Sequence, residues 1–145
     1  MEKIAKQGPS NANMSGDGLV SSGNYFIVGA VIVEKSMAFA GLPNNYFDSL
    51  QIELAHDDGG KLGFKSLRNL QLNGVWREKI GADGKPYKAK GTFFELLFEN
   101  CSGMSFPQTC DWINANLKGR HVNVNYCRYP RTYGGFGCLP VVEFI

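Results

Sequence analysis

Residues 24–34 read Asn-Tyr-Phe-Ile-Val-Gly-Ala-Val-Ile-Val-Glu, an apolar run that is rich in valine and isoleucine. The run is too short for most helices, and branched side chains pack well on a pleated surface, so we expect a buried strand. Gly29 in its middle predicts a β-bulge or a sharp bend. The stretch therefore favours a β fold.

Several other segments carry a strand pattern. Residues 49–55 alternate between apolar and polar side chains, which is typical of a half-buried strand. Two glycines within residues 56–60 predict a turn, and the returning strand of a hairpin should then pass through Leu62 and Phe64. We expect the remaining strands at three apolar segments, 92–99, 122–127 and 138–145. Between the strands we expect two loops, at residues 35–47 and 129–137, and an inserted hairpin or long loop at residues 67–91.

One helix is predicted before the last two strands. Ser105 can cap its first turn, and Gln108 stands three residues later, as in a capping box. Apolar side chains then recur at helical spacing on one face, and they are Phe106, Cys110, Ile113 and Leu117. Gly119 is the expected end of this helix.

The composition indicates one compact domain. The chain has 145 residues, of which 43% are hydrophobic and 19% charged, which excludes general disorder. With 18 glycines it is unlike a coiled coil, and no apolar stretch is long enough for a membrane helix. Residues 1–22 predict a flexible N-terminal arm without the apolar core of a secretory signal, so we expect a cytoplasmic protein whose domain spans residues 23–145.

The cysteines and histidines do not form a recognisable chemical site. Cys101, Cys110, Cys127 and Cys138 lack any C-x₂-C pair, and His56 and His121 do not complete a zinc pattern. We therefore expect four reduced thiols and no bound metal. The chain also has no nucleophile elbow and no phosphate-binding loop, so we expect neither a cofactor nor an enzymatic activity.

The order of the predicted elements is several strands, one helix and then two strands. Over residues 24–145 this order resembles the OB-fold, a five-stranded β-barrel with a helix between its third and fourth strands. The resemblance implies a mainly β, OB-like barrel that binds single-stranded DNA, of the type found in phages and mobile elements. It also implies a role in replication, recombination or repair, with residues 129–137 as a binding loop.

The charges are unevenly distributed along the chain. Residues 61–90 hold eight basic residues against two acids, and residues 118–136 hold four basic residues and no acid. Residues 1–60 instead hold three basic residues against seven acids. The two basic segments also contain aromatic residues, and single-stranded nucleic acid needs both, because cations follow the phosphates and rings stack on the bases.

We therefore predict a basic, aromatic groove that binds single-stranded nucleic acid, with DNA favoured over RNA and with little sequence specificity. Thirteen residues are candidates for it, and they are Lys65, Arg68, Trp76, Arg77, Lys79, Tyr87, Lys88, Arg120, Arg128, Tyr129, Arg131, Tyr133 and Phe136.

A second hypothesis needs no nucleic acid. The expected loop at residues 35–47 contains five large apolar side chains, and exposed apolar residues often mark protein contacts. The chain would then be a β-rich structural or interaction protein, such as a phage assembly component or an adaptor. Both hypotheses allow a homo-oligomer, and neither needs a membrane.

Overall fold

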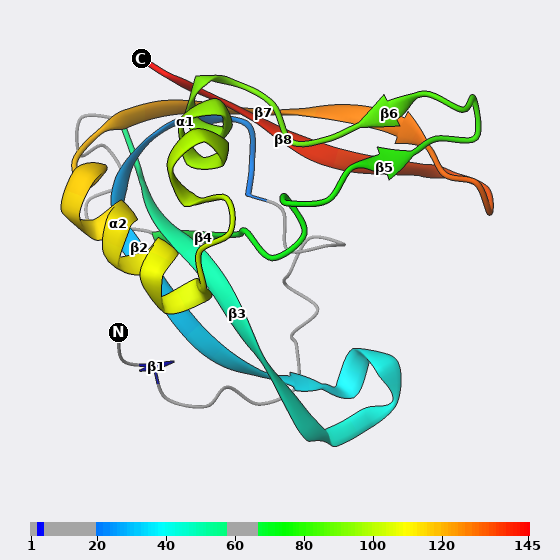
Figure 1. Cartoon of the computed structure of the whole chain (residues 1–145), viewed down its shortest axis with the longest axis horizontal. Coiled ribbons are helices and arrows are strands. Elements are labelled where there is room, and N and C mark those ends of the chain that lie inside the picture. Colours follow the sequence, from blue (N-terminus) through cyan, green and yellow to red (C-terminus); the bar gives the residue numbers. More distant parts are fainter. Residues whose placement is uncertain (1–2, 5–19, 58–66) are drawn as a thin grey trace.

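The computed structural model describes residues 3–4, 20–57 and 67–145. It is mainly β, as predicted, with five strands in an antiparallel sheet of order β4-β3-β2-β7-β8 (Figure 1). β1 pairs in parallel with β2, and β5 and β6 form a separate hairpin. The elements in chain order are β1 (Lys3–Ile4), β2 (Gly23–Met37), the short 3₁₀ helix η1 (Ala38–Ala40), β3 (Leu42–His56), β4 (Leu67–Gln71), β5 (Lys79–Ile80), β6 (Pro86–Tyr87), α1 (Thr92–Cys101), α2 (Phe106–Asn116), β7 (His121–Pro130) and β8 (Phe136–Phe144).

The central strand β2 contains the bulge that its glycine predicted. Its register against β3 shifts between Ile27 and Gly29. At this point Asn114 of α2 accepts a hydrogen bond from the backbone nitrogen of Ala30 at 2.8 Å and donates one to the oxygen of Ala30 at 3.0 Å. A Cβ atom at position 29 would meet Asn114 Oδ1 at 2.7 Å, so the glycine lets the helix approach the strand.

The core lies between the sheet and the two helices. Residues 49–55 lie in strand β3, as predicted, and Leu50, Ile52 and Leu54 are buried. The expectation of a half-buried strand is wrong, because Ser49, Gln51 and Ala55 on the opposite face are buried as well. α2 packs on β2, and α1 packs on β8. The other large side chains of this core include Tyr25, Ile27, Phe93, Phe94, Leu97, Ile113, Val122, Val124 and Val142.

The expectation of a strand at residues 92–99 is wrong, because this segment is helix α1. Phe93, Leu97 and Cys101 recur every four residues and bury one helical face, while Glu95 and Glu99 lie exposed between them. The chain therefore has two helices before its last two strands, not one.

The helix predicted after Ser105 is confirmed as α2. The Ser105 hydroxyl accepts a hydrogen bond from the backbone of Gln108, and the Gln108 side chain accepts one from the backbone of Ser105, so the capping box is complete. Cys110 and Ile113 are fully buried on the predicted face. Among the described residues, no helix is long and apolar enough to cross a membrane.

The five strands do not close into the expected barrel. Closure would require β4 to pair with β8, but part of the outer edge of β8 is already occupied. Lys90 forms a parallel bridge with Val141, donates to the oxygen of Pro140 at 3.0 Å and accepts from the nitrogen of Val142 at 2.9 Å. Within the described part of the chain, the sheet therefore stays open between β4 and β8.

Two of the expected loops are instead the ends of long hairpins. Residues 35–47 continue β2 and β3 around η1, and the loop expected at 129–137 shrinks to residues 131–135. Within 67–91 the structure has strand β4 and the β5–β6 hairpin. The expected strand residues Leu62 and Phe64, and most of the expected N-terminal arm, lie outside the described residues.

The long hairpins project from the sheet as two arms (Figure 1). We call residues 34–48 the β2–β3 arm, and residues 126–140 the β7–β8 arm. The strands β2 and β7 pair only over Gly23–Phe26 and His121–Val124, and beyond this joint the arms diverge.

Candidate nucleic-acid interface

The β5–β6 hairpin docks on the β7–β8 arm and brings the two basic segments of the sequence together. The Tyr87 and Tyr129 rings stack with their centroids 5.7 Å apart and their planes at 30°. The backbone nitrogen of Ala82 donates to the oxygen of Pro130 at 2.8 Å. Gly81 lies in this junction, where a Cβ atom would come within 2.9 Å of the Tyr87 ring.

The tip of the β7–β8 arm presents rings beside cations. The Arg128 guanidinium lies 4.3 Å from the centroid of the Phe136 ring, and that of Arg131 lies 5.8 Å from the Tyr133 ring. The Tyr133 side chain is 82% exposed and Phe136 is 57% exposed, so both rings can accept another flat group. Their exposure in a β protein is unusual, because rings of this size normally pack in the core.

The charge of this arm is predominantly positive. The docked hairpin and the arm tip carry four basic residues, and they are Lys79, Lys85, Arg128 and Arg131. Asp83 is the acid among them, and the Tyr87 hydroxyl donates to its Oδ2 at 2.6 Å. This hydrogen bond, together with one from the backbone of Lys85, lowers the pKa of Asp83, and it raises the pKa of Tyr87. The carboxylate thus stays ionised and holds the tyrosine ring against the arm.

Seven of the thirteen predicted residues therefore belong to one surface. We call this surface the arm cluster, and it comprises Lys79, Tyr87, Arg128, Tyr129, Arg131, Tyr133 and Phe136. It joins residues that are up to 57 positions apart in the sequence, through the β5–β6 docking just described.

Three other predicted residues lie away from the arm tip. Trp76 is half-buried and packs edge-on against Phe98, with the ring centroids 5.6 Å apart. The Lys88 ammonium lies 5.1 Å from the centroid of the same Phe98 ring. Arg77 is exposed next to Trp76 in the segment between β4 and β5.

The structure separates Arg120 from the arm cluster. Its guanidinium lies 4.1 Å from the centroid of the Phe144 ring, next to the first residue of β7. The ten-residue strand β7 is about 30 Å long, so Arg120 and Arg131 stand at opposite ends of it. Lys65 lies outside the described residues. Arg68 pairs with Leu54 through its backbone, and its side chain is outside the description.

The β2–β3 arm carries a different surface at its tip. Phe39, Leu42 and Tyr46 are exposed there, and Phe39 meets Phe47 edge-to-face at 5.9 Å. Residues 36–47 contain no charged side chain. The predicted nucleic-acid groove did not include these residues. Their apolar character within an expected loop could have indicated an exposed contact surface.

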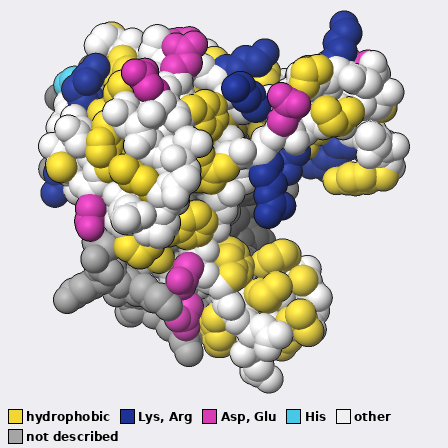
Figure 2. All heavy atoms as spheres, in the orientation of Figure 1, with side chains coloured by type: hydrophobic (Ala, Val, Ile, Leu, Met, Phe, Trp, Pro, Cys, Tyr) yellow, Lys and Arg dark blue, Asp and Glu magenta, His cyan; other side chains and the backbone are white. Residues whose placement is uncertain are grey.

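The space between the arms is open on the face seen in Figure 2. Cationic side chains gather on the β7–β8 arm, and hydrophobic side chains gather at the end of the β2–β3 arm across from it. The acids of this second arm, Glu34 and Asp48, pair directly across its strands nearer to the sheet. A ligand between the arms would therefore meet cations and rings on one side and uncharged apolar groups on the other.

Other reactive groups are dispersed. His121 Nδ1 and Asp57 Oδ2 are 2.6 Å apart and join the end of β3 to the start of β7. No three histidine, cysteine or acidic side chains gather into a metal-binding group among the described residues. All four cysteines are free thiols, with Cys101 and Cys110 buried and Cys138 exposed.

Comparisons of the chain with protein family models, with curated proteins and with solved structures found no match.

Proposed function

We propose that this protein binds single-stranded nucleic acid, DNA in preference to RNA, between its two arms. The observation that carries the proposal is the arm cluster, in which Arg128 and Arg131 stand beside the exposed rings of Phe136 and Tyr133. Cations would contact successive phosphates, while each ring would stack on a base and contribute about 1–3 kcal/mol. Because phosphates and ring faces are common to all sequences, this binding would have little sequence specificity.

The topology supports an OB-like assignment. When only the five strands of the sheet are numbered, their order is 3-2-1-4-5, and the helices stand between the third and fourth strands. The hairpin end at residues 38–41 joins the first and second of these strands, and residues 131–135 join the fourth and fifth. In OB-folds these two connections flank the surface that binds oligonucleotides. A protein of this kind would act in replication, recombination or repair of a phage or mobile element.

Fluorescence polarisation of a labelled single-stranded oligonucleotide tests the proposal. We expect binding at low salt that weakens as salt rises, with a log–log slope of about −3 if about four phosphates are neutralised. Arg131→Ala and Tyr133→Ala should each weaken binding about tenfold without unfolding the protein. Lys118→Ala, an exposed cation at the end of α2, is the matched control and should bind normally. Absence of binding even at low salt would overturn the proposal.

One observation favours a second candidate function. The uncharged tip of the β2–β3 arm exposes Phe39, Leu42 and Tyr46, and a projecting apolar tip suits insertion into a partner protein. The protein would then be a structural or adaptor component. Light scattering of the wild type and of Phe39→Ser tests this: a defined assembly that the variant loses, together with no affinity for oligonucleotides, would favour the second candidate.

A further inference from the structure

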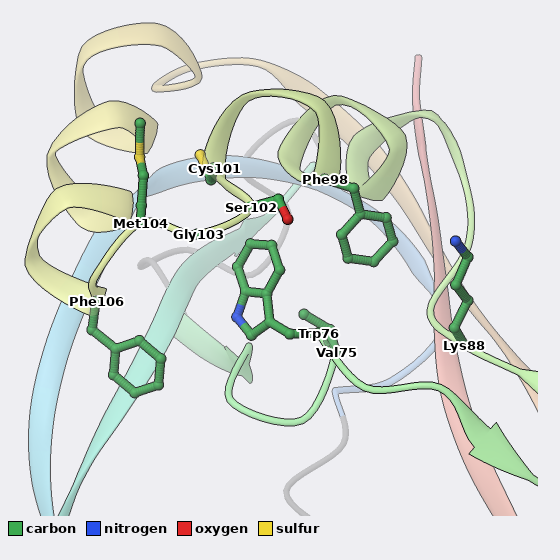
Figure 3. Close-up of a pocket in the computed structure, with 9 residues that line it drawn as sticks. All are labelled: Val75, Trp76, Lys88, Phe98, Cys101, Ser102, Gly103, Met104 and Phe106. Carbon is green, nitrogen blue, oxygen red and sulfur yellow. The ribbon is translucent and has the colours of Figure 1, made fainter.

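A cavity of about 470 Å³ lies where the chain enters and leaves α1, at the base of the β7–β8 arm (Figure 3). Its walls are mainly aromatic and apolar. The rings of Trp76, Phe98 and Phe106 surround it, and Met104 and Ser102 come from the turn between α1 and α2. A cavity of this size and lining is typical of a site for a small planar ligand.

The polar side chains that line this cavity are hydrogen-bond donors, and they suit a ligand with acceptor atoms. Lys88 is the single charged residue among those that line it, and no lining residue is acidic. The Lys88 ammonium lies over the Phe98 ring but makes no ion pair with any described residue. Trp76 is half-buried and Ser102 is exposed at this cavity, so the indole N–H and the hydroxyl can donate to a ligand. A suitable ligand is therefore a flat ring that carries acceptor atoms and a negative charge.

The cavity and the arm cluster each receive a side chain from the same segment of the chain, Tyr87 and Lys88. Lys88 directly follows Tyr87, whose ring stacks on Tyr129 of the arm. In an extended segment, consecutive side chains point to opposite sides, so this one peptide presents a ring to the arm and a cation to the cavity.

We propose that the cavity takes one nucleotide of the bound strand, with the base among the three rings and the phosphate at Lys88. This inference rests on the proposed function and extends it, because it assigns a role to Trp76 and Lys88, which lie away from the arm tip. A nucleobase supplies the flat ring with acceptor atoms, and its phosphate supplies the charge. The site would thus hold one unstacked base while the arm cluster grips the neighbouring backbone.

Tryptophan fluorescence tests the proposal directly. The chain has two tryptophans, so Trp112→Phe leaves Trp76 as the reporter. Titration with oligothymidylate should quench the Trp76 emission over the same concentration range that raises the polarisation of the labelled strand. Thymidine monophosphate serves as a second probe and distinguishes a free nucleotide from one within a strand.

Two variants alter the cavity without removing its walls. Lys88→Gln removes the charge, and Ser102→Phe fills the space from a position with extended backbone geometry that accepts any side chain. Each should weaken oligonucleotide binding about tenfold, and Ser102→Phe should also abolish the quenching. Lys118→Gln is the control for the loss of one exposed cation and should change neither signal.

The outcomes separate the two proposals. If the strand binds and depends on Arg131, yet Trp76 emission is unchanged and both cavity variants bind normally, the cavity proposal is wrong and the proposed function stands. If the strand does not bind at all, the proposed function itself fails. Quenching by thymidine monophosphate but not by the strand would contradict the cavity proposal, because the cavity would then hold a free nucleotide.

Discussion

Asn114 of α2 holds both backbone polar groups of Ala30 in β2, with one hydrogen bond of 2.8 Å and one of 3.0 Å. Ala30 stays in register with Ile52 of β3, but the pairing of β2 with β7 ends at Phe26. The side-chain amide of Asn114 therefore supplies a donor and an acceptor to the backbone of Ala30. The contact spans 84 residues of sequence and fixes the helix against the strand from which both arms diverge. It therefore holds α2 on β2 and contributes to the stability of the core.

Replacement of Asn114 by alanine should lower the free energy of unfolding by about 2–3 kcal/mol, because it leaves two buried backbone groups without partners. Urea unfolding followed by circular dichroism measures this change. Asn116→Ala is the matched control, since its exposed side chain donates only to the oxygen of Trp112. A loss as small for Asn114 as for Asn116 would contradict the role given to the Ala30 contact.

Gly137→Ala should weaken oligonucleotide binding while the sheet stays folded. A Cβ atom at this position would overlap the Tyr129 ring, which faces Gly137 across the β7–β8 ladder. The displaced ring would lose its stack with Tyr87, so the β5–β6 hairpin and its lysines would detach. We expect a loss of about tenfold in affinity by polarisation. Gly74→Ala, with open space around it, should bind like the wild type.

The four thiols should react with alkylating agents in order of exposure. Cys138 is exposed and should react first, whereas burial raises the pKa of Cys101 and raises that of Cys110 to about 11. The thiolate is the reactive form, so Cys110 should stay unmodified at neutral pH in the folded protein. Mass spectrometry after iodoacetamide treatment checks the order, with urea-unfolded protein as the control. Labelling of Cys110 as fast as of Cys138 would be inconsistent with its buried position.

Docking of the β5–β6 hairpin should weaken in acid. The folded protein lowers the pKa of Asp83 below its ordinary value of 3.8, so the stabilisation is fully present above that value. It is lost as the pH falls through the lowered pKa of the folded state. Tyr87→Phe removes the main hydrogen bond and should move the Asp83 pKa back toward 3.8. Carboxyl titration by NMR measures this shift, and an unchanged pKa in the variant would refute the coupling.

The sequence correctly predicted those elements whose pattern is compatible with only one type of secondary structure. The capping box at Ser105 points to one structure and is confirmed. Residues 49–55 form a strand as predicted, but the alternation did not show that its polar face, with Gln51, is buried too. Residues 92–99 were misassigned because five of their eight side chains are large and apolar, and such a run suits a buried strand as well as a helix. The burial of Phe93 and Leu97 beneath β8, which decides for the helix, is a tertiary contact.

The assembly of the arm cluster could likewise not be predicted from local sequence patterns. Basic and aromatic residues could be counted in the sequence, but the docking of Tyr87 on Tyr129 joins segments 42 residues apart, and no local pattern predicts it. Arg120 and Arg131 were both predicted to line one groove, and the structure separates them. The two are close in sequence, but the extended strand β7 between them puts them at its opposite ends.

The bridge of Lys90 to β8 also affects how copies of this protein can associate. An uncovered strand edge can template the addition of a strand from another molecule, the first step of fibril growth. At Pro140–Val142 the groups that would bind an incoming strand are already engaged by Lys90 of the same chain. Sheet extension from one molecule to the next is therefore blocked at this part of β8, at the base of the β7–β8 arm.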